Sequence, residues 1–235
     1  PISDETPTTQ GLYRQSSSYP NKLLSYIGSP NWDMSDIFVL NIDGSEKVSL
    51  MPAGLGSAGD FKISSDGEYV VFTAGVTKPE PHNLYRTKFD GTTVPTRVND
   101  PFANGGCVGS SDLALSGQVA LYWADPDVLE QYNIYAQNYI TTAQVKLNPT
   151  LPSYSEIAEF SLSPDGNKVI YRADIDTENQ YDIYSVNLNG SNNTKLNTPA
   201  NTGVNQFAVS GDSSTVVFEA SGSELVTVPI GGGTN

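Results

Sequence analysis

The sequence predicts an all-β fold, a β-propeller built from four-stranded antiparallel blades. The main observation is an internal repeat that occurs five times in 235 residues. One marker is the aromatic residue near the end of an apolar run, with steps of 46, 50, 49 and 47 residues between Tyr26, Phe72, Tyr122, Tyr171 and Phe218. A second marker keeps nearly the same spacing at Phe38, Tyr85, Tyr135, Tyr184 and Val226. A period of about 40–50 residues with strand-like patterning is typical of propeller blades.

The fourth repeat shows the content of one blade most clearly. An alternating strand at 160–163 is followed by the turn Pro-Asp-Gly-Asn, in which proline pre-sets φ and glycine tolerates a positive φ. A second strand, a polar loop and a third strand lead to Asn189-Gly190, a strong hairpin signal. The remaining strands are expected at 168–173, 181–188 and 194–196.

The other repeats follow this order with local differences. Repeat three has a short first turn, Ser116-Gly117, and carries Thr141-Thr142 where other repeats have Asp-Gly or Asn-Gly. Repeat five stops before its outer strand. We therefore expect an N-terminal segment at 1–11 and repeats at about 12–50, 61–98, 112–147, 158–196 and 205–235.

Closure of the ring has two possible forms. A propeller that stays open leaves unpaired strand edges and bare sheet faces. Residues 1–11 could supply the strand that repeat five lacks, which would close a five-blade ring. Alternatively, the five repeats belong to a larger propeller of six to eight blades. The second form is favoured because the chain ends inside a repeat.

The charge balance excludes several classes of partner. Twelve Lys and Arg stand against 26 Asp and Glu, a formal net charge of -14. Such a surface repels nucleic acid and anionic membranes, but it can attract basic protein patches and divalent cations. No apolar run is long enough to insert into a membrane. The lysine-poor composition, rich in Ser, Thr and Asn, favours an exported protein.

The repeat resembles that of the TolB-type β-propellers. The resemblance is carried by residues 160–174 and 181–190, and by the turns at Asp66-Gly67, Asp165-Gly166 and Asp90-Gly91. It implies an exported or periplasmic propeller, in a family of which many members act as protein-interaction platforms. We expect an exported protein in the periplasm, at the cell surface or outside the cell. Related propellers precede the catalytic domain of prolyl-oligopeptidase-like enzymes. The chain differs from TolB itself because no N-terminal α/β domain is visible.

Two acidic loops align without a gap and suggest a metal site. Residues 124–135 and 173–184 place carboxylates at alternate positions, Asp125 and Asp127 in one loop and Asp174 and Asp176 in the next. Ca²⁺ takes six to eight oxygen ligands, so converging carboxylates could hold it. The alternative is a structural or solvated role for the four side chains. No other cofactor is expected.

Aromatic residues in the same regions suggest a ligand rim. Trp32, Trp123, Tyr132 and Tyr181 could together bind a sugar or a peptide, although aromatic residues in blades usually belong to the core. No catalytic pattern is present: His82 is the single histidine, and no Gly-x-Ser-x-Gly motif occurs. Cys107 is expected to be a core or loop residue.

These observations favour a non-catalytic module that binds a protein or a glycan on one propeller face. The first alternative is the propeller portion of a hydrolase, prolyl-oligopeptidase-like or carbohydrate-active, whose catalytic residues lie largely outside this chain. The second alternative is a structural subunit that self-assembles into an extracellular layer or filament. Propellers host all of these functions, so the fold alone does not choose among them.

Overall fold

The computed structural model describes residues 12–28, 35–76, 82–102, 106–109, 113–126, 128, 130–199 and 203–233. These residues form nineteen strands and no α-helix. The strands group into five antiparallel sheets, named blades 1 to 5 in chain order. The all-β propeller fold predicted from the repeat is confirmed. No helix of the described residues is long and apolar enough to cross a membrane.

Each sheet keeps its strands in sequence order. Blade 1 contains β1 (Leu12–Gln15), β2 (Lys22–Gly28), β3 (Ser35–Asn41) and β4 (Val48–Ser49). Blade 2 contains β5 (Ser57–Ile63), β6 (Tyr69–Gly75), β7 (Asn83–Lys88) and β8 (Thr96–Arg97). Blade 3 contains β9 (Ala114–Ser116), β10 (Val119–Ala124), β11 (Asn133–Asn138) and β12 (Gln144–Lys146). Blade 4 contains β13 (Ile157–Leu162), β14 (Lys168–Ala173), β15 (Asp182–Asn187) and β16 (Thr194–Lys195). Blade 5 contains β17 (Gln206–Val209), β18 (Thr215–Ala220) and β19 (Glu224–Pro229).

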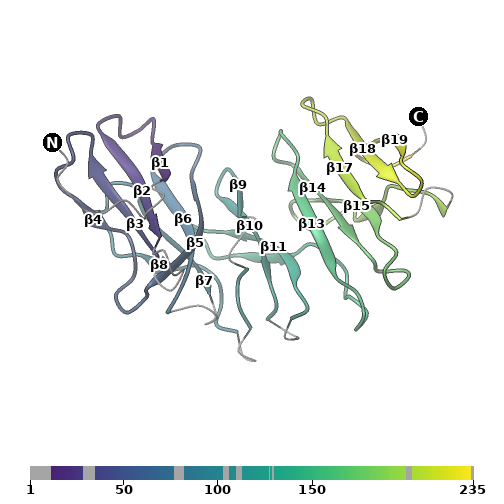
Figure 1. Cartoon of the computed structure of the whole chain (residues 1–235), viewed down its shortest axis with the longest axis horizontal. Helices are drawn as coiled ribbons and strands as arrows, with labels where there is room; N and C mark the ends of the chain where they lie inside the picture. Colours follow the sequence, from purple (N-terminus) through teal and green to yellow (C-terminus); the bar gives the residue numbers. More distant parts are fainter. Residues whose placement is uncertain are drawn as a thin grey trace.

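The blades follow one another around an open arc, with the first strand of each sheet towards the concave side (Figure 1). Blades 1 and 5 lie at opposite ends of this arc, and the described sheets do not close into a ring. Blade 5 has three strands among the described residues, as expected from the missing outer strand. Residues 1–11, which would supply the ring-closing strand in the five-blade alternative, lie outside the described residues.

The core lies between the blades. Four buried clusters each join two neighbouring blades, so both faces of blades 2, 3 and 4 are covered. In blade 4, Tyr171 and Tyr184 face blade 3, whereas Ile170 and Ile183 face blade 5. A single sheet of this size cannot bury its apolar faces alone, and stacking solves that problem as in other repeat proteins.

The two sequence markers are cross-strand partners in four of the five blades. The pairs Phe72 with Tyr85, Tyr122 with Tyr135 and Tyr171 with Tyr184 stack with ring centroids 5.8, 6.0 and 5.1 Å apart, and Phe218 pairs with Val226.

The marker in blade 1 was assigned one residue too late. Phe38 pairs with Ser25, while Tyr26 pairs with Ile37. Because successive strand residues point to opposite faces, Tyr26 faces blade 2 and contacts Phe61 there, at 6.2 Å between ring centroids. Ser25 is therefore the residue equivalent to Phe72, and both markers then take the same step of 47 residues from blade 1 to blade 2.

The Ser-x-Asp turns join the first two strands of blades 2, 4 and 5. In blade 4, the Ser163 hydroxyl donates to Asp165 Oδ1 at 2.6 Å, and Asp165 Oδ1 also accepts the Asn167 N–H at 3.1 Å. Gly166 adopts a φ of +73°, which favours glycine at this position. The same hydrogen bonds recur from Ser64 to Asp66 and from Ser210 to Asp212.

Candidate functional site

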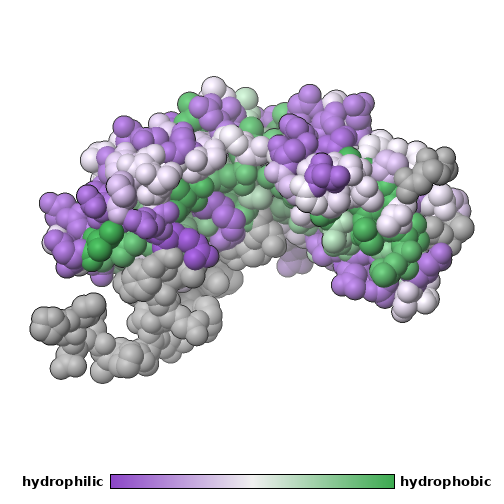
Figure 2. All heavy atoms as spheres, turned by 90° about the horizontal axis from the view of Figure 1, so that it is seen from above, coloured by the Kyte–Doolittle hydropathy of each residue, from purple (hydrophilic) through white to green (hydrophobic). Residues whose placement is uncertain are grey.

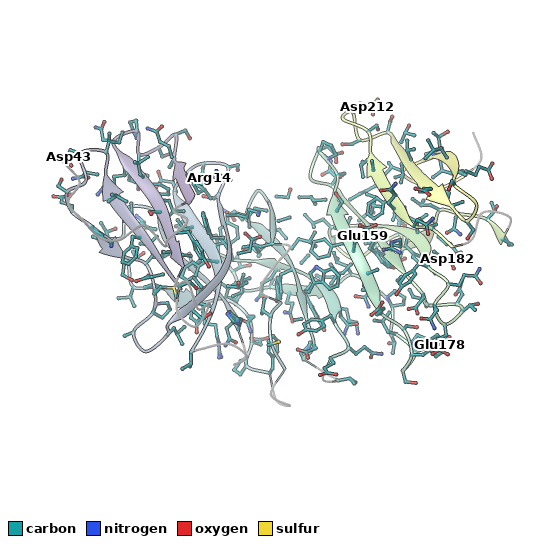
Figure 3. All side chains as sticks on the ribbon, in the orientation of Figure 1. Arg14, Asp43, Glu159, Glu178, Asp182 and Asp212 are labelled. Carbon is teal, nitrogen blue, oxygen red and sulfur yellow. The ribbon has the colours of Figure 1, made fainter. Side chains whose placement is uncertain are left out.

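One edge of the arc carries the loops between the second and third strands and the crossings between blades. We call this edge in blades 3 and 4 the loop face and define it by Glu130, Tyr132, Tyr154, Glu178 and Tyr181. In Figure 3, Glu178 lies at this edge, opposite the hairpin turns that carry Asp43 and Asp212. All but one of the described site residues predicted from the sequence lie in these loops, and Trp123 lies in the preceding strand.

Asp125 and Asp174 occupy equivalent buried positions and make equivalent contacts. Asp125 accepts backbone N–H groups from Cys107 at 2.6 Å and Glu130 at 2.8 Å. Asp174 accepts those of Glu156 at 2.7 Å and Asn179 at 3.0 Å. Each carboxylate thus ties its own loop to the segment that precedes the first strand of the blade.

Each of these loops needs a left-handed residue five positions after its buried aspartate. Glu130 and Asn179 have φ values of +65° and +59°, a conformation that costs non-glycine residues energy. In both loops the N–H that the aspartate holds belongs to this strained residue. The buried aspartates therefore stabilise loop conformations that the chain alone would not favour.

The other two predicted metal ligands are not brought into this arrangement. Asp176 is exposed and forms a 2.7 Å ion pair with Lys195, which also contacts Asp182 at 2.7 Å. Asp127 lies outside the described residues. No group of three or more His, Cys, Asp or Glu within the described ranges is spaced to hold a metal ion. The calcium site stays a prediction.

The four predicted aromatic residues have different surroundings. Trp123 packs against Phe160 of the next blade at 5.3 Å between ring centroids, so it belongs partly to the core between blades 3 and 4. Tyr132 and Tyr181 are partly exposed on the loop face. Trp32 lies outside the described residues.

The hydroxyls of Tyr132 and Tyr181 are anchored in the same way. Tyr132 Oη lies 3.2 Å from the Sγ of the free Cys107, and Tyr181 donates to the carboxylate of Glu156. Burial, followed by this hydrogen bond to Glu156, raises the pKa of Tyr181 to about 12. The guanidinium of Arg172 lies 4.6 Å from the centre of the Tyr181 ring. Both rings are thus held in place while part of their surface faces solvent.

Sequence analysis missed a buried asparagine that recurs after the fourth strand. Asn148 Oδ1 accepts the Ile134 N–H at 2.8 Å, and its amide nitrogen donates to Asn133 Oδ1 at 2.8 Å. Asn99 and Asn197 make the corresponding contacts in blades 2 and 4. The signal was present as a strict 49-residue spacing of a basic residue, an aliphatic residue and Asn.

The concave side of the arc carries two ion pairs, one in blade 2 and one in blade 4. Lys62 pairs with Asp60 at 3.0 Å on β5, and Arg172 on β14 pairs with Glu159 on β13 at 3.2 Å. The Asp60 carboxylate also accepts the Leu113 N–H of blade 3 at 3.1 Å. These charges are paired among themselves, and no nucleophile–base pair accompanies them in the hydrogen bonds of the described residues.

Comparison with solved structures supports the propeller fold. A TolB structure from Agrobacterium tumefaciens has a TM-score of 0.54 and 16% identity, covering 95% of this chain and 79% of that one. Oligogalacturonate lyase in complex with manganese has a TM-score of 0.54 and 14% identity, covering 96% and 83%. Prolyl oligopeptidase B from Galerina marginata has a TM-score of 0.61 and 12% identity, covering 92% and 31%.

No protein-family model matches the chain, and no curated protein matches it in sequence. The chain spans less than a third of the prolyl oligopeptidase, so the comparison concerns the propeller part alone. At these identities the likeness is one of fold. The chain is therefore similar to TolB-like propellers in architecture, with five blades arranged in an open arc.

Proposed function

We propose that this chain is a non-catalytic, exported propeller module that binds a protein or glycan partner through its loop face. The observation that carries the proposal is the repeated placement of Tyr132 and Tyr181, two anchored rings at equivalent positions of adjacent blades. A tyrosine ring with a fixed hydroxyl offers apolar contact area at low entropic cost, which suits both sugars and peptides.

The surroundings of the two rings favour a neutral or basic ligand. Tyr154, which is exposed, donates a hydrogen bond to the Ile175 carbonyl at 3.3 Å and so joins the crossing to the next loop. Glu130, Glu178 and Asp176 are exposed in the same loops. Carboxylates beside aromatic rings can accept hydrogen bonds from sugar hydroxyls or pair with lysine and arginine of a partner.

The test is binding of a glycan panel and of basic peptides by the wild-type chain and by the double variant Tyr132→Ala/Tyr181→Ala. The matched control is Tyr132→Phe/Tyr181→Phe, which keeps both rings. We expect binding to be lost in the first variant and largely retained in the second, with both folded by circular dichroism. Equal binding by wild type and the alanine variant would place the binding surface elsewhere.

A second candidate is the propeller portion of a hydrolase. It is favoured by the TM-score of 0.63 to a prolyl endopeptidase, of which the chain spans 34%. Peptide turnover by this chain together with a separately supplied catalytic domain would support it. Turnover that is unchanged without the propeller would contradict it.

A third candidate is a self-assembling structural subunit, favoured by the outward face of blade 5. Leu225 is 72% exposed there and lies on the same face as Val217. In blade 4 the equivalent residues, Ile183 and Ile170, are fully buried against blade 5. Figure 2 shows apolar side chains gathered at this end of the arc. Sedimentation that is independent of concentration, and equal for wild type and Leu225→Glu, would contradict assembly through this face.

A further inference from the structure

Blade 2 carries a pocket of about 160 Å³ on the face that looks towards blade 3. This volume equals the share of about five water molecules in the liquid. The pocket is lined by the cations Arg86 and Lys88, the hydroxyl-bearing Thr93 and Thr96, the Tyr69 ring and the exposed Val94. None of these residues belongs to the loop face.

The two cations depart from the repeat. Strand register places Arg86 level with Val39, Ala136 and Ser185 of blades 1, 3 and 4. Those three residues are 0, 4 and 1% exposed and help to fill the spaces between blades. An arginine at this position cannot be explained by the packing that the other blades use.

Lys88 stands where the same three blades have asparagine. Asn41, Asn138 and Asn187 each hydrogen-bond the turn of their own hairpin. In blade 2 the Thr93 hydroxyl contacts the backbone instead, accepting the Lys88 N–H at 2.9 Å. The Lys88 side chain is therefore not needed for the turn.

The pocket opens where a contact between blades is lost. At three other interfaces a hairpin glycine packs closely on the outer strand of the preceding blade. A Cβ added to Gly91, Gly190 or Gly232 would lie 3.0, 2.7 or 2.8 Å from Val48, Val145 or Thr194. Thr96 is the equivalent residue in blade 2, and the hairpin of blade 3 that would cover it carries Thr141-Thr142.

Neither cation forms a salt bridge within the described residues, although the Asp90 carboxylate attracts Lys88 electrostatically at longer range. The salt bridges among the described residues involve Lys22, Lys62, Arg172 and Lys195. No described carboxylate lies within 4.0 Å of Arg86 or Lys88. Arg86 is held over the Tyr69 ring at 5.6 Å from its centroid. The nearby Asp90 carboxylate is engaged by the N–H and hydroxyl of Thr92, at 2.9 and 2.7 Å.

The geometry points to an anion-binding site between Arg86 and Lys88 that takes a compact oxyanion: a carboxylate, sulfate or phosphate group on a small molecule or sugar. The guanidinium fork can bind two oxygens of such a group, Lys88 adds a second charge, and the threonine hydroxyls can donate further hydrogen bonds. Tyr69 and Val94 form the apolar wall for the rest of the ligand. The net charge of -14 does not prevent this, because exposed carboxylates farther from the pocket than a Debye length of about 8 Å are largely screened by salt.

The test is titration of the whole chain with sulfate, inorganic phosphate and acetate. The readout is the chemical shift of the backbone amide NMR signals. Sodium chloride at matched ionic strength is the reference. We expect saturable shifts centred on residues 86–96, and the relative affinities for the three probes identify which oxyanion the pocket prefers. Shifts equal to those with sodium chloride would overturn the site.

Variants that restore the repeat provide the second arm. Arg86→Val and Lys88→Asn copy Val39 and the asparagines of the other blades, so both should fold. We expect each to weaken binding about tenfold or more, since each removes a charge-assisted hydrogen bond. The matched control is Arg97→Val, because Arg97 pairs with Tyr85 and so lies on the opposite face of the same sheet. A loss as large in Arg97→Val as in Arg86→Val would mean that overall charge, rather than the pocket, sets the affinity. The site does not depend on the proposed function of the loop face.

Discussion

Ser116 on the first strand of blade 3 donates a hydrogen bond to the carbonyl of Gly166, in the first turn of blade 4, at 3.0 Å. A Cβ at Gly166 would lie 2.2 Å from that hydroxyl oxygen, and the residue has a φ of +73°. Ser16 and Gly67 repeat this contact at 2.6 Å between blades 1 and 2. Each turn thus locks onto the preceding blade.

Gly166→Ala should destabilise the protein by about 2–4 kcal/mol, because it combines left-handed strain with a clash across the interface. Gly44→Ala is the matched control: Gly44 has a φ of +82° and nothing within 4 Å of the added Cβ. It should cost only about 1 kcal/mol. Urea unfolding measures both. Equal losses would show that the contact with Ser116 contributes nothing, whereas partial rescue by Ser116→Ala would support it.

Asn148→Ala should destabilise the protein by about 2 kcal/mol or more. The change removes the acceptor of the buried Ile134 N–H and the donor to Asn133 Oδ1. Ser153→Ala, in an exposed position of the following crossing, should be nearly neutral. Thermal unfolding of the two variants side by side checks the difference, and a small effect for Asn148→Ala would mean that water replaces the amide.

Asp174→Asn should cost about 2–3 kcal/mol, because a charged acceptor of two backbone N–H groups is lost. Asp176→Asn should cost at most about 1 kcal/mol, since Asp176 is exposed and Lys195 is its only ion-pair partner within the described residues. Thermal unfolding of the wild type and of both variants measures these losses. Repeating it with excess Ca²⁺ and with EDTA tests the predicted calcium site. A rise in the wild-type Tm with Ca²⁺ that is absent in both variants would establish the site. A wild-type Tm that is the same with Ca²⁺ and with EDTA would mean that Asp174 only stabilises the loop.

Stability should fall steeply as the pH drops below the ordinary aspartate range. Hydrogen bonds from the Ser163 hydroxyl first, and then from Asn167, lower the pKa of Asp165 from 3.8 to about 2. The Ser210 hydroxyl, followed by Ser214, lowers that of Asp212 from 3.8 to about 2. Because the folded pKa is below the unfolded one, this stabilisation is complete above pH 3.8 and is lost as the pH falls towards about 2.

The corresponding measurement is Tm from about pH 5 to about pH 2 for wild type and for Asp165→Asn/Asp212→Asn. The double variant should have a lower Tm at the upper end and a flatter profile. Glu224→Gln is the control, since the Glu224 side chain is exposed and its carboxylate accepts no hydrogen bond from the described residues. An unchanged profile in the double variant would assign the acid sensitivity to other carboxylates.

The amino-acid sequence by itself determined the number of repeats, the strand order within a blade and the positions of the turns. These features depend on local signals: alternation with a period of two, Asp-Gly and Asn-Gly turns, and a near-constant repeat length. The same local information misassigned Tyr26, because an error of one residue in a strand reverses the face. The 49-residue spacing of Asn99, Asn148 and Asn197 was equally visible in the sequence. Its role becomes clear only in the fold, where each side chain accepts a backbone N–H from the third strand of its blade.

Only the tertiary structure decided what the polar residues do. Asp174 and Asp176 look alike in sequence, but one is buried against backbone N–H groups and the other is exposed beside Lys195. Tyr132 and Trp123 were grouped as one rim, yet one lies on the loop face and the other packs between blades. Arg86 and Lys88 stand out only when the strand register of blade 2 is compared with that of blades 1, 3 and 4. Burial and hydrogen-bond partners come from residues far apart in the chain, so they follow from packing rather than from local pattern.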